Sequence, residues 1–284
     1  MDLQRYLPHA SLAALVDHLW HVSDAPVHAR ERILPSGTME LVFNLAEDEV
    51  RIYGDVGSDT CRRHSGAVAC GVFSRFFVID TREHACMMGV HFKPGGAFPF
   101  LRRLPALELA DSHRDLAAIW GDKAPRLRQR LRGARTVQER FVLLEAALLE
   151  ELRFAVRGHR VIQPALQALA APGASAARLA AQANLSHRRL IQLFSQEVGS
   201  TPKLFQRLRR FQQGLQLARA RSTPGNPRGA LLAQRAGYCD QSHWIRDCVA
   251  FAGLTPAQYA SLFTDLVKGD HLPLLADSAA GLDG

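Results

Sequence analysis

The stretch GYCDQSHWIRDCVAFAGLTP, residues 237–256, decides the fold of the C-terminal part of this chain. Gly237 suits the end of a preceding helix, because glycine enters the left-handed backbone region without steric cost. Asp240 then suits the N-cap of a new helix, where its carboxylate can accept bonds from unpaired backbone N–H groups. Side chains that predict a buried face recur at i, i+4 and i+7: Trp244, Cys248 and Phe251. A short helix with a polar outer surface after a tight turn is typical of a recognition helix in a helix-turn-helix unit.

The same pattern occurs earlier in the chain, at a constant offset of 54 residues. Four pairs of positions align in this way: Ser186 with Asp240, Leu190 with Trp244, Gly199 with Gly253, and Pro202 with Pro256. One such unit would be weak evidence. Two units in register, each ended by a glycine and a following proline, predict a duplicated helix-turn-helix.

Residues from about 160 to 265 resemble the DNA-binding domain of AraC-type (AraC/XylS) bacterial transcription regulators. The segments that carry the resemblance are LAAQANLSHRRLIQLF (179–194), the G-S-T-P break (199–202) and AGYCDQSHWIRDCVAFAGLTPAQY (236–259). The resemblance implies two helix-turn-helix units joined rigidly by the helix that begins at Pro202. The sequence departs from the family's usual aromatic and basic residues at Cys239, Cys248 and Gln192, which bears on base preference rather than on fold.

A recognition helix enters the major groove of DNA with its N-terminal half. We therefore expect DNA contacts from polar residues of both units, which are Ser186, His187, Arg188, Arg189 and Gln192 in unit one and Gln241, Ser242, His243 and Arg246 in unit two. Arg188 and Gln192 share a helix face, and we expect the first to read guanine and the second adenine or a neighbouring pair. The alternative is that these residues are solvated or contact phosphate alone. For His243, a packed or phosphate-facing role is favoured over base readout.

The charge of the chain is unevenly placed. Residues 160–265 hold 13 Lys and Arg against 4 Asp and Glu, a net charge of +9, whereas the remainder holds 22 against 23. A basic module beside a neutral one indicates a nucleic-acid-binding domain with a partner domain that does not bind DNA. No basic amphipathic helix with an aromatic apolar face supports membrane-surface binding instead.

The predicted fold class is α+β, in three parts. Residues 1–157 form an N-terminal domain, residues 158–268 an all-α domain of two helix-turn-helix units joined by a linker helix, and residues 269–284 a flexible tail. Short β-branched and aromatic runs between residues 30 and 100 predict a small antiparallel sheet or barrel with flanking helices, which could enclose a ligand.

Two apolar stripes of the N-terminal domain have helical spacing. The first, within residues 1–25, consists of Leu12, Leu15, Val16 and Leu19, after which a strand could begin at Trp20. The second belongs to a strong amphipathic helix over residues 135–158. Its wide stripe serves either the core of the domain or a dimer interface, and the core is favoured.

The N-terminal part also carries a resemblance. ILPSGTMELVF (33–43) and GVHFKPGGAFPFL (89–101) are similar to an uncharacterised domain that precedes this DNA-binding module in many bacterial regulators. The two resemblances imply a transcription regulator that binds double-stranded DNA, with RNA polymerase as a candidate partner. The N-terminal domain would sense a small-molecule effector, whose identity the sequence does not give, or form a homodimer.

The remaining features bear on location and chemistry. No run approaches 18 apolar residues, no signal peptide is evident, and five cysteines at irregular spacing favour reduced thiols in a cytoplasm. Residues whose spacings match no common zinc pattern are Cys61, His64, Cys70, Cys86 and His91, so we expect no metal and no cofactor. The rival hypothesis is an enzyme on the N-terminal domain that uses the helix-turn-helix module for targeting, with Cys61, Cys70 or Cys86 as nucleophile beside His64, His84 or His91. Because Cys70 and Cys86 lie in apolar runs, we expect inert core thiols and no catalytic residue.

Overall fold

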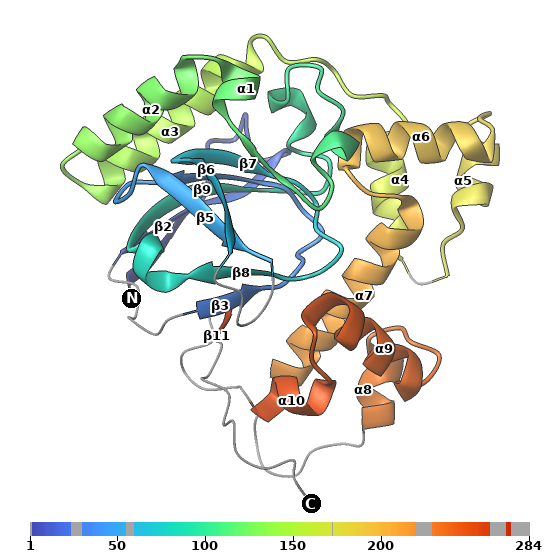
Figure 1. Ribbon diagram of the computed structural model, residues 1–284. Helices are drawn as coiled ribbons and strands as arrows, with labels where there is room; N and C mark the ends of the chain where they lie inside the picture. The colour runs from blue at the N-terminus through green and yellow to red at the C-terminus, as the bar shows by residue number, and fades with distance from the viewer. Residues whose placement is uncertain are drawn as a thin grey trace, which may run out of the picture.

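The computed structural model describes residues 2–23, 30–54, 60–171, 173–219, 229–261 and 271–273 of the chain. Antiparallel strands and a few helices make up the N-terminal part, and helices make up most of the C-terminal part (Figure 1). The predicted α+β class, with strands first and a helical region after them, is therefore confirmed.

The strands of the N-terminal part form two sheets in which every pairing is antiparallel. The first sheet has the order β1 (Asp2–Tyr6), β2 (Val16–Ser23), β9 (Cys86–Phe92), β4 (Glu40–Asn44), β7 (Ala67–Cys70) and β10 (His113–Asp115). The second has the order β11 (His271–Pro273), β3 (Arg30–Ile33), β8 (Phe77–Asp80), β5 (Glu49–Tyr53) and β6 (Cys61–Ser65). The inward side chains of both sheets enclose the space between them, which positions the cavity described below.

In the middle of the first sheet, the side chain of Trp20 lies close to the backbone of β9. Gly89 lies opposite Trp20 in the register of β2 and β9. A Cβ atom at Gly89 would stand 2.4 Å from Cζ2 of Trp20. Only glycine lets the indole ring lie flat across β9 at this point, and Trp20 thereby becomes part of the wall of the cavity.

The helix suggested by the apolar spacing of Leu12 to Leu19 is wrong. Residues 10–15 form turns, and strand β2 begins at Val16 and pairs with both β1 and β9. A register shift between Val16 and His18 places both Val16 and Leu19 on the buried side, which mimics helical spacing in the sequence. Residues 16–23 form a strand because they gain hydrogen bonds to both β1 and β9. These partners are distant in sequence, so the apolar spacing of the segment does not reveal them.

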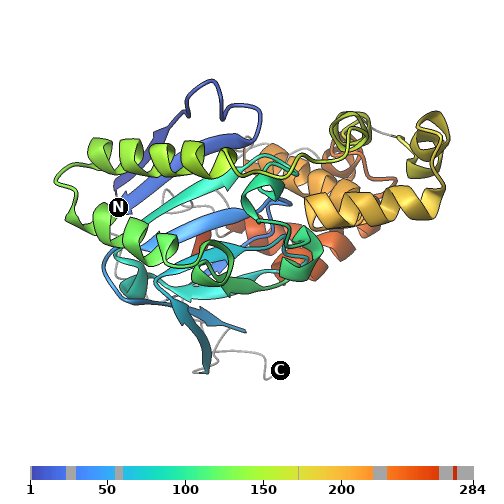
Figure 2. The ribbon, with the colours of Figure 1, turned by 90° about the horizontal axis from the view of Figure 1, so that it is seen from above.

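Helices cover one side of the sheets (Figures 1 and 2). They are α1 (Ala117–Trp120), α2 (Lys123–Gly133) and α3 (Val137–Leu152), with short 3-10 turns η1 (Thr81–His84), η2 (Phe98–Phe100) and η3 (Ala106–Leu109) between strands. The predicted amphipathic helix over residues 135–158 is α3, capped by Thr136. Its apolar stripe of Phe141, Leu144 and Leu148 is buried in the chain's own core, as the favoured interpretation expects.

The C-terminal helices follow the predicted order. They are α4 (Ile162–Leu169), α5 (Ala176–Gln182), α6 (His187–Val198), α7 (Pro202–Arg219), α8 (Gly229–Arg235), α9 (Gln241–Ala252) and α10 (Pro256–Ser261). Helices α4 to α6 share a small core with Phe205 of α7, whereas α8 to α10 pack around the C-terminal part of α7. The boundary predicted at residues 157 and 158 falls in the segment between α3 and α4.

Both helix-turn-helix units contact the N-terminal part. The α7 residue Gln212 donates from Nε2 to the carbonyl oxygen of Pro35 at 2.7 Å, and the N–H of Phe76 donates to the carbonyl oxygen of Phe251 at 2.8 Å. The C-terminal end of α6 meets η3, where Gly199 lies against the backbone of Ala106. Unit two thereby shares one continuous hydrophobic cluster with the sheets.

The tail differs in part from the prediction. Within the predicted flexible segment 269–284, His271–Pro273 forms strand β11, which pairs antiparallel with β3 at the edge of the second sheet. The other residues of that segment lie outside the described ones. Among the helices that the structure describes, none combines the length and the apolar character needed to cross a bilayer.

Candidate DNA-binding surface and ligand cavity

The turn of unit two forms as the sequence predicts. Gly237 has φ +83°, a left-handed conformation that lets the chain turn sharply after α8. Asp240 caps α9, since its carboxylate accepts from the N–H of His243 at 2.7 Å. Gly253, with φ +67°, ends the helix in the left-handed region. Local backbone chemistry therefore sets both ends of α9.

Unit one is built in the same way with different residues. Asn184 takes the left-handed conformation, with φ +53°, at the position that Tyr238 occupies in unit two. Ser186 caps α6, because its hydroxyl accepts from the N–H of Arg189 at 3.1 Å. Gly199 closes the helix with φ +84°. Helices α6 and α9 have 12 residues each and matching capped ends.

The structure places the predicted DNA-contact residues on the outer faces of these helices. Those with exposed side chains are Ser186, His187, Arg188, Arg189, Gln192, Gln241, Ser242 and Arg246. His243 is half-buried, and its ring lies 5.4 Å from that of Tyr238 in an edge-on contact. The opposite faces are closed by Leu190 and Trp244, so the predicted core role of Trp244 is confirmed.

One contact links two of the candidate residues of unit one. The guanidinium of Arg189 donates from Nη1 to Oε1 of Gln192 at 2.9 Å. Arg188 lies beside this pair on the same exposed surface. Bidentate reading of adenine by Gln192 needs its carboxamide oxygen, so Arg189 and the base would compete for that atom. Base contact by these residues stays a prediction.

A partly buried ion pair behind α9 is not apparent from the sequence, and its Arg207 side chain stays 35% exposed. Asp247 lies 1% exposed and accepts from Nη2 and Nε of Arg207 at 2.6 and 3.2 Å. The guanidinium also lies 4.9 Å from the ring centre of Phe251. An acidic residue one turn after Trp244 on the buried face was the available signal, because a buried carboxylate needs a partner. The pair ties α9 to the joining helix α7.

The thiol of Cys248 packs in the same core. Burial raises its pKa to about 12, and the nearby carboxylate of Asp247 acts in the same direction. Cys248 is therefore a neutral core residue at neutral pH, where the AraC-type pattern usually has an aromatic side chain.

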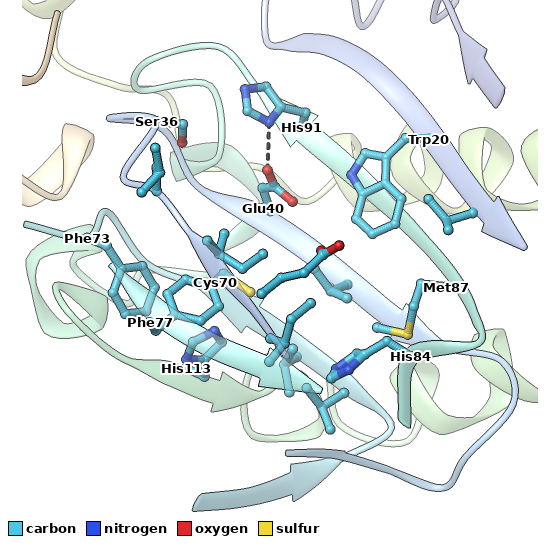
Figure 3. Close-up of a pocket in the computed structure, with 18 of the residues that line it drawn as sticks. Trp20, Ser36, Glu40, Cys70, Phe73, Phe77, His84, Met87, His91 and His113 are labelled. Atoms are coloured by element: carbon cyan, nitrogen blue, oxygen red, sulfur yellow. Dashed lines mark hydrogen bonds and ion pairs between the residues drawn. The ribbon is translucent and has the colours of Figure 1, made fainter. Parts of the chain in front are cut away.

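A cavity of about 310 Å³ lies between the two sheets, with walls formed mainly by apolar and aromatic side chains (Figure 3). In the figure, Phe73, Phe77 and His113 gather at one end, and His91 and Glu40 face each other at another. The size and lining are those of a small-molecule site. The cavity residues come from nine strands or their flanking turns, so no single sequence motif marks it.

A chain of hydrogen bonds forms the polar part of the cavity wall. The carboxylate of Glu40 lies 2.7 Å from Nδ1 of His91, whose Nε2 lies 3.1 Å from the hydroxyl of Thr38. Ser36 continues the chain, with 2.8 Å between the two hydroxyl oxygens. His18 stacks on His91 at 5.1 Å between ring centres, and burial lowers the pKa of His18. This end of the cavity can exchange hydrogen bonds with a polar ligand group.

The opposite end of the cavity lies at His113, whose side chain is uncharged. Burial, reinforced by the nearby His64, lowers the pKa of His113 to about 3, so its imidazole is neutral at neutral pH. Cys70 lies between the two ends, because it pairs with Glu40 of β4 on one side and with His113 of β10 on the other. Burial, reinforced by the carboxylate of Glu40, raises the pKa of the Cys70 thiol well above its usual range, which keeps it protonated. His113 and Cys70 therefore line a site for apolar ligand groups, and neither supplies an anion or a thiolate nucleophile.

The other cysteines lie apart from one another. Cys61 stands on β6, and Cys86 lies at the start of β9 with its sulfur 3.6 Å from Nε2 of His21 and 3.9 Å from Nη1 of Arg140. Across the part of the chain that the structure describes, no three His, Cys, Asp or Glu side chains gather as a metal site would require.

The cavity wall also contacts the joining helix. The turn Leu34–Ser36 and Thr38 line the cavity, and within that turn Pro35 accepts the bond from Gln212 of α7. Next to them, Gly37 has φ +80° and packs against Leu208 of α7. A ligand that touches Pro35 would therefore contact a residue that is itself hydrogen-bonded to α7, the helix between α6 and α8.

Two family matches agree with this division of the molecule. Residues 179–261 match the family described as helix-turn-helix domain, and residues 4–115 match a domain of unknown function, DUF6597. The chain is thus a DNA-binding transcription regulator with a helix-turn-helix domain. That domain is of the AraC type, as the sequence predicts, and it follows a DUF6597 domain.

Among solved structures, two of ToxT from Vibrio cholerae resemble the chain at low identity. ToxT of strain O395 is 9% identical, with 87% of this chain and 97% of that one covered and a TM-score of 0.44. ToxT of strain SCE256 with bound unsaturated fatty acid is 10% identical, with 88% and 96% covered and a TM-score of 0.42.

A more distant structure is that of the transcriptional regulator CdpR from Pseudomonas aeruginosa, at 16% identity, with 78% of this chain and 57% of that one covered and a TM-score of 0.26. No curated protein matches the sequence.

Proposed function

We propose that this protein reads one asymmetric DNA site with two recognition helices, α6 and α9, placed in successive major grooves. The observation that carries the proposal is the matched pair of capped helices with polar outer faces, held on the single helix α7. Successive major grooves on one face of DNA repeat at about 34–36 Å, and an α-helix fits each of them. Because the two outer faces differ in sequence, the two halves of the site should differ as well.

The N-terminal domain would bind a small effector in the cavity between its sheets. Support comes from the volume of the cavity, from its apolar walls and from the chain of hydrogen-bonded side chains that runs from Glu40 to Ser36. The wall at Pro35 supports a route from the cavity to α7. In a thermal-shift screen of small molecules, true ligands should raise the melting temperature of the native chain but not of Val68→Trp, whose larger side chain would fill the cavity.

We propose that the cavity binds its ligand without changing it. The thiol of Cys70, which lines the cavity, is held protonated and is therefore a poor nucleophile. A recovered ligand should therefore leave the protein chemically unchanged, as mass spectrometry of the released compound would show. Turnover that Thr38→Ala abolishes would favour the enzyme hypothesis instead.

Self-association and contact with RNA polymerase are further parts of the proposal. Large apolar side chains exposed outside α6 and α9 support a protein-binding role of the surface: Leu7, Leu107, Phe154 and Leu231. Sedimentation of the chain with and without its DNA site would measure self-association directly.

The experiment that tests the DNA-reading proposal is selection of duplexes from a random pool with the full chain. We expect enrichment of a site with two unlike parts about one helical turn apart. Enrichment of a single short motif would contradict two-helix reading. Salt-sensitive binding with no enriched motif would contradict sequence-specific reading altogether.

A further inference from the structure

An apolar patch is exposed on the outer face of the recognition helix α9. Val249 keeps 49% of its surface exposed, although the opposite face of the helix is fully buried. Ile245 lies one turn earlier and is partly exposed. Since side chains four residues apart on a helix are neighbours, the two form one patch.

The patch belongs to the face that carries the predicted base contacts. Ser242, Arg246 and Val249 stand at i, i+4 and i+7, on the side of α9 away from Trp244. The only acidic residue within α9 is Asp247, and it is buried against Arg207. The patch is therefore flanked by a cation and by no exposed carboxylate of its own helix, which suits a DNA duplex as its occupant.

Unit one has only half of this feature. At the 54-residue offset, Ile245 corresponds to Ile191, which is likewise partly exposed, whereas Val249 corresponds to Ser195, which is buried. The neighbouring exposed positions of α6 are occupied by Arg188, Arg189 and Gln192. Unit one thus presents one partly exposed isoleucine among hydrogen-bonding groups, whereas unit two adds the exposed Val249 beside Ile245 and Arg246.

We propose that Ile245 and Val249 are specificity-determining residues that contact thymine methyl groups in the half-site read by unit two. The C5-methyl of thymine is the apolar group that base pairs display in the major groove, and apolar side chains read it by contact. Burial of each thymine methyl group against the patch removes apolar surface from water and so stabilises the complex. A base that lacks this methyl group gains no such stabilisation at the same position. The inference rests on the proposed reading of DNA by α9.

Replacement of thymidine by deoxyuridine tests the inference. Uracil pairs with adenine as thymine does but lacks the methyl group. The probe is a duplex selected by the full chain, with thymidines replaced in one half-site at a time. In the half-site whose binding depends on Arg246, we expect the Kd to rise about fourfold for each contacted methyl that is lost.

Two variants make the test specific. In Val249→Ala and Ile245→Ala, the uracil effect should shrink towards none, because the side chain that contacts the methyl is already shortened. Both positions are outside the core, so thermal unfolding should stay close to that of the native chain. Val142→Ala, at a similarly exposed valine on α3, is the matched control and should keep the full effect.

Several results would overturn the inference. They are a half-site for unit two without thymine, equal affinity for thymine and uracil duplexes, or a uracil effect undiminished in both variants. These results differ from failure of the proposed function, which would appear earlier as selection that enriches no motif. That earlier failure would overturn both proposals together.

Discussion

The two helix-turn-helix units share a backbone plan but are stabilised differently. Unit one encloses a small core of its own around Leu190 and Phe194. Unit two, around Trp244 and Phe251, belongs to one hydrophobic cluster with the sheets of the N-terminal domain, and adds the partly buried pair of Arg207 and Asp247. Duplication therefore preserved capping and turn chemistry, while burial and surface chemistry diverged.

This difference shows which unit is more strongly coupled to the N-terminal domain. A change in the N-terminal domain reaches unit two through packed side chains of one shared cluster. Unit one meets that domain where Gly199 lies against Ala106 and where Leu166 of α4 lies against Gly95. The outer faces diverge in parallel, since α6 presents arginines and an amide and α9 presents an apolar patch.

The largest effect should come from the two equivalent core positions. Trp244→Ala should lower the free energy of unfolding by about 3–5 kcal/mol and affect the N-terminal domain too, because the cavity opens in the shared cluster. Leu190→Ala should cost about 2–5 kcal/mol, confined to unit one. Urea unfolding followed by hydrogen exchange would separate the two patterns. If Leu190→Ala exposed the sheet amides as much as Trp244→Ala, the difference in coupling would be disproved.

The next effect should come from the partly buried pair of unit two. Arg207→Ala leaves the carboxylate of Asp247 buried without its partner, which should cost about 3 kcal/mol. Unit one has Leu193 at the position of Asp247 and needs no such partner. The matched control is Arg209→Ala on the same helix, where an exposed side chain should change stability by no more than about 0.5 kcal/mol. Equal losses in thermal unfolding would show that the pair contributes nothing particular.

Substitutions on the outer faces should affect DNA binding rather than stability. Arg188→Ala and Arg246→Ala should each cost about 1–3 kcal/mol on the selected site and relax base preference in different halves of it. Binding isotherms on duplexes altered in one half at a time would assign each arginine. A loss that is equal on random DNA would reduce that residue to a phosphate contact.

The smallest effect concerns pH and Glu197 of unit one. Burial raises the pKa of this carboxyl, which the N–H of His159 partly offsets as it donates to Oε1 at 2.6 Å. The folded protein therefore holds the proton more tightly than the unfolded chain, and stability falls as the pH rises from 4.5 through the raised value. Glu197→Gln should remove this fall and be more stable than the native chain at pH 7.

A series of thermal unfolding curves from pH 4 to pH 7 would check this prediction. Native and variant chains should converge at the acid end and diverge towards neutrality. Unit two has Phe251 at the equivalent position, already apolar, so no such titration is expected there. Parallel curves across the whole range would contradict the role of Glu197.

What the sequence predicts correctly here is local. The caps Ser186 and Asp240 and the left-handed Gly199 and Gly253 follow from backbone chemistry within a few residues, and the structure contains each of them. The buried position of Trp244 follows from helical spacing. The outer faces of α6 and α9 were predicted for the same reason.

What the sequence did not predict depends on contacts between distant segments. Strand β2 forms because β1 and β9 flank it, the carboxylate of Asp247 is paired from 40 residues away, and the chain from Glu40 to His91 spans 51 residues. The apolar patch at Val249 was missed for another reason. Helical spacing shows that it faces outward, but a lone valine on a helix surface carries no signal until unit one provides a comparison.

Methylation interference on the selected duplex tests most directly that two unlike helices read adjacent major grooves. Methylation of guanine at N7 blocks major-groove contact at a single base. We predict two clusters of interference about one helical turn apart, one lost in Arg188→Ala and the other lost in Arg246→Ala. A single cluster, or two clusters that both vanish in either variant, would contradict reading by two independent helices.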